Sequence, residues 1–383
     1  MATQFTLPGR TILGEHALES SEMAIKSLGK KAFIVTGKVV TKMGTVAILT
    51  DFLKKWGIAY EIFNDITGEP TDEMILLGVK AYQESKCDFL IGIGGGSPLD
   101  SVKAIAAMSV LKGDIADYMG VEIKGEFPPM VLIPTTAGTG SETTKFTIIT
   151  DTKKGVKMLL KGDDLLPDVA IIDPEFTLTA PKGITAATGM DALTHAVESY
   201  TSKKANTLTD LYAISAIKRI FKYLPLAYAD GTNRMARKEM AIAAFEAGVC
   251  INNASVTLVH GMSRPIGALF HVPHGISNAM LITECLSYAK EGCYDRFADM
   301  AFAIGVANEG MNEKDASEAF ISALKDICRK CEIPTLKEYG IKEAEFSAAI
   351  DKMASDAMAS GSPSNTRMDI QKEDLVKIYG RLF

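Results

Sequence analysis

The sequence predicts two domains of different class, an α/β half built on a parallel sheet and an all-helical half. The first half alternates apolar runs of four to six residues with helical segments, which is typical of a parallel sheet covered on both faces. From about Thr185 the strand-like runs give way to long helical stretches, and PKGIT at Pro181–Thr185 breaks the chain between them. We therefore expect domains at 1–183 and 184–383, and 383 residues suffice for two cores.

Each expected element follows from its local pattern of apolar residues. The expected strands are Ala32–Thr36, Ala59–Phe63, Phe89–Ile93, Met130–Ile133 and Val169–Ile172. The helices expected between them are Gly44–Trp56, Thr71–Ser85 and Leu99–Ser109. The second half is expected to contain helices at Gly189–Thr201, Leu208–Leu224, Ala236–Asn252, Val256–Gly267, Lys314–Cys331 and Glu343–Ala359.

Composition excludes several classes of partner. Apolar residues make up 47% and charged residues 23%, which is ordinary for a soluble globular protein. A net charge of -6 argues against a nucleic-acid partner. No apolar run approaches the ~18–20 residues that span a bilayer, and the N-terminus does not resemble a signal peptide. The six cysteines are scattered, as reduced thiols of a cytoplasmic protein are.

Four residues in the second half form a candidate metal site. Asp191 and His195 stand four residues apart in MDALTHAVES, which places both on one face of a helix. His260 and His274 follow in VHGMSRP and HVPHG, where Pro and Gly prevent one continuous helix. One carboxylate and three imidazoles suit iron or zinc. The alternative is that each histidine is a buried residue satisfied by a hydrogen bond.

Two loops in the first half are suited to phosphate. In FLIGIGGGSPLDS a strand ends at Gly94, Gly95 and Gly96, and we expect Ser97 to be the N-cap of the helix that follows. The free N–H groups of that helix suit a pyrophosphate, although such turns also serve close packing. A second strand ends in TTAGTGS after Pro134, and its hydroxyls and amides are placed to hold phosphate and ribose oxygens. Together the loops favour a dinucleotide crevice over a solvated surface loop.

These motifs, taken in order, carry a resemblance to a known family. GGGSPLDSVKAIA, IPTTAGTGSETT, ATGMDALTHAVESY, NNASVTLVHGM and HVPHGISNAM closely resemble the iron-dependent, or group III, alcohol dehydrogenases, from about residue 5 to the C-terminus. The resemblance implies a nucleotide-binding α/β domain, a helical domain and an active site in the cleft between them, an architecture shared with dehydroquinate synthase. It implies NAD as cofactor, a short alcohol or aldehyde as substrate, iron as metal with zinc possible, and a homodimer or higher homo-oligomer.

The resemblance also assigns residues. It implies that the metal ligands are Asp191, His195, His260 and His274. It implies that the cofactor lies against residues of both loops, namely Gly94, Gly95, Gly96, Ser97, Thr135, Thr136 and Thr139. Asp100 and Lys157 match further positions near the cofactor in relatives, and both are equally interpreted as solvated charges.

Two positions depart from the family pattern. Many relatives have a histidine four residues after His260, where this chain has Arg264, which stays protonated and can bind a carboxylate, sulfonate or phosphonate in a bidentate manner. The alternative is that Arg264 pairs with a protein carboxylate. His271 is then the remaining histidine near the site, as a proton relay or a turn residue. Gly37, followed by Lys38, replaces the Asp that binds the ribose 2′-OH, so NAD is favoured and NADP is tolerated.

The expected function is thus a metal-dependent NAD(P) oxidoreductase that interconverts a short primary alcohol and its aldehyde, with an anionic head group bound by Arg264 as one hypothesis. A generalist dehydrogenase of neutral short alcohols is the alternative. A dehydroquinate-synthase-like lyase would need several basic residues for a substrate phosphate, and the motifs supply only Arg264. A non-catalytic scaffold is disfavoured by four intact ligands and two intact loops. The physiological substrate and the reaction direction are not encoded in these motifs.

Overall fold

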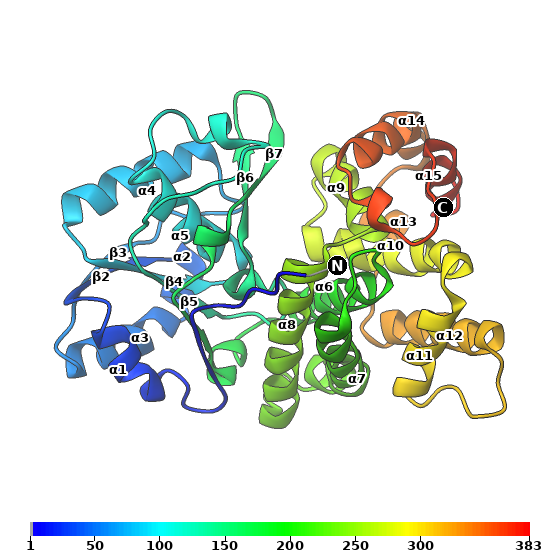
Figure 1. Ribbon diagram of the computed structural model, residues 1–383, viewed down its shortest axis with the longest axis horizontal. Helices are drawn as coiled ribbons and strands as arrows, with labels where there is room; N and C mark the ends of the chain where they lie inside the picture. The colour runs from blue at the N-terminus through cyan, green and yellow to red at the C-terminus, as the bar shows by residue number, and fades with distance from the viewer. Residues whose placement is uncertain (1–2) are drawn as a thin grey trace. The chain divides into compact units, whose positions relative to one another are not determined.

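The computed structural model describes residues 3–383 and separates into two compact units, 1–180 and 181–383. Figure 1 shows strands and helices mixed in the first unit and helices throughout the second. Both classes of fold predicted from the sequence are confirmed.

The first unit contains a six-stranded sheet and a small hairpin. Its strands are β1 Arg10–Leu13, β2 Lys31–Val35, β3 Ala59–Phe63, β4 Phe89–Gly94, β5 Met130–Pro134, β6 Phe146–Asp151, β7 Val156–Lys161 and β8 Val169–Ile172. Its α-helices are α1 Glu22–Lys26, α2 Lys38–Lys42, α3 Thr45–Lys55, α4 Asp72–Ser85 and α5 Gly96–Met108. The large sheet has the order β1-β8-β5-β4-β2-β3 with every pairing parallel, and β6 and β7 form a separate antiparallel pair.

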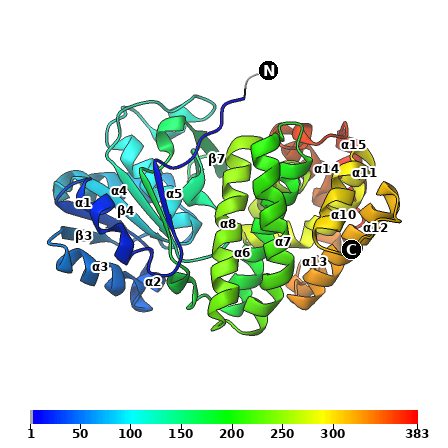
Figure 2. The same ribbon diagram turned by 60° about the horizontal axis from the view of Figure 1, so that its bottom comes forward.

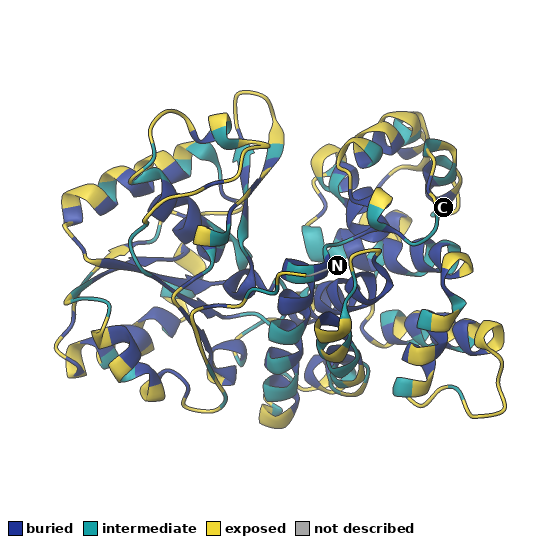
Figure 3. Cartoon of the chain, in the orientation of Figure 1, coloured by how far each residue is buried: buried dark blue, intermediate teal, exposed yellow. Residues whose placement is uncertain are grey.

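Helices cover both faces of this sheet, so its central strands are buried along their length (Figure 3). Alternate residues of each strand point to opposite faces. On one face Phe33 and Leu90 pack with α4, α5 and the β6–β7 hairpin. On the other face Ile34 and Ile91 pack with α1 and α3. The short apolar runs of the sequence reflect this double burial.

The order of the strands places a switch point between β2 and β4. From β2 the chain passes through α3 to β3 on one side, then through α4 to β4 on the other side. In open parallel sheets, ligands bind beyond the carboxyl ends of the strands at such a point. The glycine-rich turn after β4 lies at this end of the sheet.

Three strands were not predicted from the sequence. β1 is an exposed edge strand with little apolar character, and β6 and β7 form a hairpin that buries only alternate residues. Their pattern lacks the continuous apolar run of a buried parallel strand.

The second unit is helical. Its α-helices are α6 Lys182–Thr201, α7 Thr207–Ala229, α8 Arg234–Ala254, α9 Leu258–Phe270, α10 His274–Ala289, α11 Tyr294–Ala303, α12 Glu313–Lys330, α13 Leu336–Tyr339, α14 Glu343–Ala359 and α15 Lys372–Tyr379. Helices α6, α7 and α8 lie side by side (Figure 2). No single helix within residues 3–383 is long and apolar enough to span a membrane, and only α8 and α9 together, bent by 101°, meet that test.

Helix α6 begins at Lys182 rather than at Gly189, so the predicted start is wrong. Gly189 lies inside the helix, at a place where α6 and α7 pack closely. A Cβ at Gly189 would lie 2.4 Å from the side chain of Leu224 on α7. The missing side chain therefore serves helix packing, which its low helix propensity does not reveal.

Candidate functional site

The four predicted metal ligands come together on three helices of the second unit. Asp191 and His195 lie one turn apart on α6, His260 lies in the first turn of α9, and His274 begins α10. The Nε2 atoms of the three histidines lie 3.6 Å to 3.7 Å from Oδ1 of Asp191. All four ligand atoms lie within 4.8 Å of one another. The spacing in the sequence therefore corresponds to one cluster in space.

The turn between α9 and α10 brings His274 back to this cluster. α9 ends before His271, whose φ of 54° is left-handed and reverses the chain. Pro273 follows and precedes the first residue of α10. Gly275 allows α10 to lie against α6, because a Cβ there would lie 2.6 Å from the carbonyl oxygen of Ala187.

The electrostatics of the cluster favour an anionic Asp191 and a neutral His274, whereas at His260 burial lowers the pKa but Glu198 and Asp191 outweigh it and raise it. Burial alone raises the pKa of the Asp191 carboxyl, but His195 and His274 outweigh it and hold that pKa well below its usual range. Burial, together with the neighbouring imidazoles and Arg264, lowers the pKa of His274 to about 3. At neutral pH, Asp191 thus carries a charge and His274 presents a lone pair.

The donor set fits a divalent transition metal. Three imidazole nitrogens and one carboxylate oxygen suit iron or zinc. Metal–nitrogen bonds of about 2.1 Å in a tetrahedral site imply ligand atoms about 3.4 Å apart, close to the 3.6 Å to 3.7 Å measured from Asp191.

Asn278 shows the same convergence of acceptors. Its Nδ2 lies 2.7 Å from Oδ1 of Asp191 and 3.1 Å and 3.2 Å from Nε2 of His260 and His274. An amide has two N–H groups and cannot satisfy three acceptors. Its own Oδ1 is buried and has no hydrogen-bond partner among residues 3–383. The point where these three acceptor atoms meet is therefore better suited to a cation than to an amide donor.

Glu198 was not predicted from the sequence, and it is fully buried on α6 and lies 2.5 Å from Nδ1 of His260. The signal was its spacing, because a residue seven positions after Asp191 lies on the same face of a helix. Asn278 was missed too, although it follows His274 by four residues on α10.

Arg264 lies one turn after His260 on α9 and is partly buried. Its Nη1 donates a hydrogen bond of 3.0 Å to Oγ of Ser362. Within the described chain it forms no ion pair with a carboxylate, so the alternative of a structural salt bridge is not supported. Its charge is close enough to lower the pKa of His274. His271 is exposed, and its left-handed backbone fits the turn.

In the first unit, the two predicted phosphate loops lie next to each other. Gly94 ends β4 with φ 155°, where a Cβ would lie 2.7 Å from Pro98. The backbone N–H of Thr135 donates a hydrogen bond of 2.8 Å to the carbonyl oxygen of Gly94. A Cβ on Gly96 would lie 3.0 Å from the side chain of Thr139. Glycine at position 94 thus allows the sharp turn from β4 into α5, and glycine at position 96 allows the second loop to lie close to the first.

The prediction that Ser97 is the N-cap of this helix is wrong. α5 begins at Gly96, and Gly95 is the N-cap residue with extended backbone (φ -72°, ψ -164°). The chain enters the helix directly from the strand, which shifts the cap two residues earlier. Ser97 thus lies in the first helical turn, whose free N–H groups suit an anion. Thr136 lies beside this cap, 3.7 Å from the Cβ position of Gly95.

Asp100 is tied to the second loop rather than solvated. Its Oδ1 accepts a hydrogen bond of 2.5 Å from Ser141 Oγ, and its Oδ2 accepts one of 2.9 Å from the backbone of Ile148. One turn later on α5, Lys103 is fully buried and donates to the carbonyl oxygen and Oγ1 of Thr144. Its Nζ also donates to the first carbonyl of β6. Both charges thus fasten the end of the threonine loop to α5.

The remaining predicted cofactor residues lie at other places in this unit. Gly37 is the N-cap residue of α2, and a Cβ there would lie 2.9 Å from a carbonyl oxygen of the β3–α4 connection. Lys38 forms an exposed ion pair of 2.9 Å with Asp65. Lys157 lies on β7 and forms an ion pair of 2.7 Å with Glu69.

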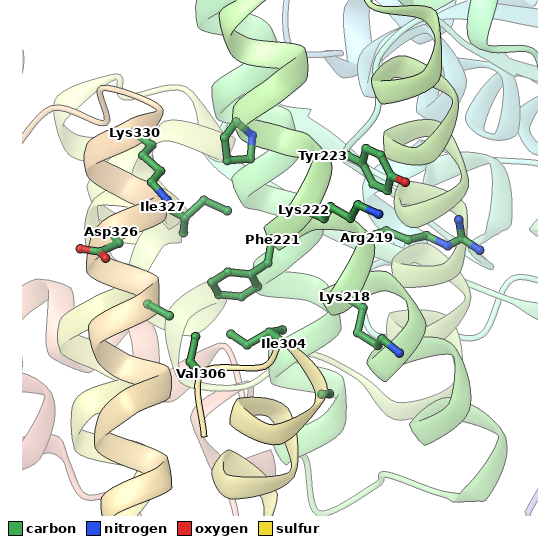
Figure 4. Close-up of a pocket in the computed structure, with 13 residues that line it drawn as sticks. Lys218, Arg219, Phe221, Lys222, Tyr223, Ile304, Val306, Asp326, Ile327 and Lys330 are labelled. Carbon is green, nitrogen blue, oxygen red and sulfur yellow. The ribbon is translucent and has the colours of Figure 1, made fainter. Parts of the chain in front are cut away.

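A cavity of about 520 Å³ lies elsewhere in the second unit, between α7, the end of α11 and α12 (Figure 4). Phe221, Ile304 and Ile327 form part of its apolar lining, and three lysines line it as well. None of the predicted site residues lines it. The candidate site is therefore identified by its converging ligand atoms and not by this cavity.

A parallel sheet with a glycine-rich turn at its switch point and an Asp–His₃ cluster are the features that a metal-dependent, nucleotide-binding oxidoreductase requires. Two family models match the chain, "Iron-containing alcohol dehydrogenase" over residues 8–174 and "Fe-containing alcohol dehydrogenase family, C-terminal" over residues 185–383. The chain belongs to the iron-containing alcohol dehydrogenase family.

Individual relatives agree with this assignment. The chain is 37% identical to 1,3-propanediol dehydrogenase of Citrobacter freundii over 385 residues, which cover 99% of this chain and 98% of that protein. It superposes on the crystal structure of a 1,3-propanediol oxidoreductase with a TM-score of 0.96, 34% identity and full coverage of both chains. A sulfoacetaldehyde reductase from Bifidobacterium kashiwanohense in complex with NAD+ matches with a TM-score of 0.88 and 29% identity, covering 100% of this chain and 99% of that one.

Proposed function

We propose that this enzyme interconverts a short primary alcohol and its aldehyde with NAD and a divalent iron, and that Arg264 selects an aldehyde with an anionic head group. The observation that carries the substrate proposal is the Arg264 guanidinium, which is partly buried near the ligand cluster and lacks a carboxylate partner in the described chain. Buried guanidinium groups are normally paired. A substrate anion would provide the missing partner.

Asp191, His195, His260 and His274 would hold the metal, because their lone pairs converge on one point. When bound, the iron supplies Lewis acidity toward a substrate oxygen, and the nicotinamide supplies or accepts the hydride. The protein supplies position and charge. Zinc fits the same donor set and is the alternative metal.

Arg264 would orient the substrate by binding its anionic head group. Nη1 of Arg264 donates one hydrogen bond to Ser362, and the other N–H groups of the guanidinium have no partner within residues 3–383. A sulfonate, carboxylate or phosphonate accepts two such hydrogen bonds in parallel. One structural neighbour is described as a sulfoacetaldehyde reductase, which supports a sulfonate as one candidate head group. The relatives described as acting on 1,3-propanediol favour the alternative, a neutral short-chain substrate.

The cofactor would lie on the loops after β4 and β5. Gly94, Gly95 and Gly96 bring free N–H groups of α5 close to a pyrophosphate, and Thr135, Thr136 and Thr139 offer hydroxyls beside them. Gly37 presents no carboxylate to repel a 2′-phosphate, so NADP is tolerated while NAD is preferred. His271 is exposed, which suits proton exchange with water.

The test is NADH oxidation by iron-loaded, anaerobically purified enzyme with paired aldehydes. Sulfoacetaldehyde and succinic semialdehyde are compared with propanal and pentanal, in wild type and in Arg264→His. Hydrogen bonds to a charged group contribute about 1.5–3 kcal/mol, so kcat/KM for the anionic aldehydes should fall roughly 10- to 100-fold in the variant. Values for the neutral aldehydes should change less than about threefold, since their contacts do not involve the guanidinium charge.

Arg219→His is the matched control, because the Arg219 guanidinium on α7 already pairs with Glu239 and Glu246. It should leave the preference for anionic aldehydes unchanged. If wild type prefers neutral aldehydes and Arg264→His does not alter that preference, the enzyme is a generalist alcohol dehydrogenase and Arg264 is structural.

A further inference from the structure

We infer that Glu198 is a positioning residue that fixes the tautomer of His260 and thereby the affinity of the site for its metal. The inference rests on the proposed function, since it presumes that the Asp–His₃ cluster binds a divalent cation. It concerns a residue outside that cluster and follows from the hydrogen bonds that surround one buried carboxylate.

Glu198 is fully buried in the second unit, where an unpaired carboxylate is strongly disfavoured. Its Oε2 lies 2.5 Å from Nδ1 of His260. Its Oε1 accepts a hydrogen bond of 2.9 Å from Thr257 Oγ1 and one of 2.5 Å from the backbone N–H of Val259. Three donors therefore surround this carboxylate, and every one belongs to the start of α9.

These contacts cap helix α9 from another helix. Thr257 stands at the N-cap position, yet its side chain makes no capping bond of its own. Glu198 on α6 accepts the free N–H of Val259 in the first turn instead, and its charge suits the positive end of the helix dipole. The start of α9, and with it the backbone of His260, is thus held in register with the helix that carries Asp191 and His195.

The carboxylate also determines which ring nitrogen of His260 carries the proton. A carboxylate only accepts hydrogen bonds, so Nδ1 of His260 must be protonated and must donate. In the neutral ring Nε2 then keeps its lone pair, and this is the atom that lies 3.7 Å from Oδ1 of Asp191 in the ligand cluster. In metal sites, such partners of a ligating histidine fix its orientation and raise its basicity.

A glutamine at position 198 should reverse this tautomer. The backbone N–H of Val259 can only donate, so the amide oxygen must replace Oε1. The amide NH₂ then faces Nδ1 of His260, which must give up its proton and accept. The proton moves to Nε2, and the lone pair that the metal needs is lost. Glu198→Gln retains the shape of the side chain and the bond to α9, so it changes the tautomer with little change in packing.

The experiment measures Co²⁺ binding to metal-free protein by competition with a chelator and by the visible absorption of the bound ion. Wild type, Glu198→Gln and Asp191→Asn are compared at one pH. Loss of such a histidine partner typically lowers metal affinity about 10- to 100-fold, and we expect a decrease of that size in Glu198→Gln with an altered Co²⁺ spectrum. Glu246→Gln is the matched control, because it makes the same change at a largely buried carboxylate on α8 that bonds to Ser215; its affinity should equal that of wild type.

The tautomer itself is read in metal-free wild type by selective ¹⁵N labelling of the histidines, of which the chain has five. At a pH above the raised pKa of His260, we expect its signal to report a protonated Nδ1 and a bare Nε2. A neutral ring with its proton on Nε2 in wild type overturns the inference even if Glu198→Gln does not fold. Wild-type affinity and spectrum in a folded Glu198→Gln variant overturn it as well. If wild type and Asp191→Asn bind Co²⁺ equally, the metal site proposed above fails instead.

Discussion

Both units bury charged side chains on a central helix, but they do so in opposite ways. On α5 of the first unit, Asp100 and Lys103 form hydrogen bonds with backbone and hydroxyl groups of the loop and strand beside them. On α6 of the second unit, Asp191 and His195 point their acceptor atoms toward two further histidines. The first arrangement is saturated within the protein, and the second leaves several acceptors facing one another.

This difference separates a structural use of buried charge from a ligand site. Burying an ionised group is costly unless donors or opposite charges surround it. The α5 charges meet that condition without any ligand. The α6 cluster gathers more acceptors than the amide of Asn278 can satisfy, and metal binding should therefore stabilise the second unit strongly.

The largest effect is expected from Asp191→Asn, which retains shape and removes the anionic ligand. Lewis-acid stabilisation contributes several kcal/mol to the barrier, so kcat/KM should fall by about three orders of magnitude. The variant should also lose the rise in melting temperature that iron gives the wild type. Calorimetry of protein treated with a chelator and then reloaded anaerobically measures both states. Equal iron-dependent shifts in variant and wild type would remove Asp191 from the metal site.

Lys103→Met should produce the largest loss of stability in the first unit. The change leaves two backbone carbonyl groups and Oγ1 of Thr144 without their donor and removes the cation near Asp100 and Glu142. Breaking one partner of a buried charge arrangement costs about 3–5 kcal/mol. The free energy of unfolding in urea measures it, with Lys154→Met, an exposed lysine, as control. A cost below that of the control would mean that the threonine loop does not depend on this clamp.

The sequence sufficed for the features that depend on local pattern. Continuous apolar runs predicted β2, β4, β5 and β8, because strands covered on both faces have no polar side. β3 was predicted from its apolar residues too, although it is a mostly exposed edge strand. The i, i+4 spacing of Asp191 and His195 predicted their shared helix face. His260 and His274 were joined to them because one carboxylate and three imidazoles suit one metal ion, and the resemblance to a known family implied the same four ligands.

Features that depend on contacts between distant residues were not predictable. Glu198 looks like an ordinary helix residue until His260, 62 positions later, is seen to bond to it. Lys103 reads as a solvated helix charge, since burial is decided by the segment that folds over it. The preference of N-cap positions for serine predicted Ser97 as the cap of α5. The chain instead passes directly from β4 into α5, so Gly95 is the N-cap residue.

A pH-dependent effect of moderate size is expected at Glu142, under the threonine loop. Burial raises the pKa of its carboxyl to about 7, and its Oε2 has no hydrogen-bond partner among residues 3–383. Between the usual pKa of about 4.3 and 7 the folded protein holds a proton that the unfolded chain has lost, so this group lowers stability as pH rises through that window. Glu142→Gln removes the titration. Relative to wild type, its free energy of unfolding should be about equal at pH 4.5 and higher by roughly 1–3 kcal/mol at pH 8.

Urea denaturation at both pH values checks this, with Glu61→Gln as the control at an exposed carboxylate. A constant difference between wild type and Glu142→Gln across the range would show that the carboxyl is charged throughout. In that case the charge of Lys103 outweighs burial, and the contrast between the two units would become sharper, because the buried acid of the first unit would be neutralised by the protein itself.

The smallest effect is expected at Lys157, the predicted cofactor residue with the weakest support. Its ammonium already pairs with Glu69 at 2.7 Å, and partly exposed ion pairs contribute about 0–1 kcal/mol. Lys157→Ala should therefore change the free energy of unfolding by less than about 1 kcal/mol. It should change KM for NADH less than about threefold, because a cation held by a neighbouring carboxylate adds little to the binding of a phosphate. Glu69→Gln separates the two roles. If Lys157 also reaches the cofactor, freeing it from Glu69 lowers KM for NADH and strengthens the salt dependence of binding, whereas a lysine that only pairs with Glu69 leaves both unchanged.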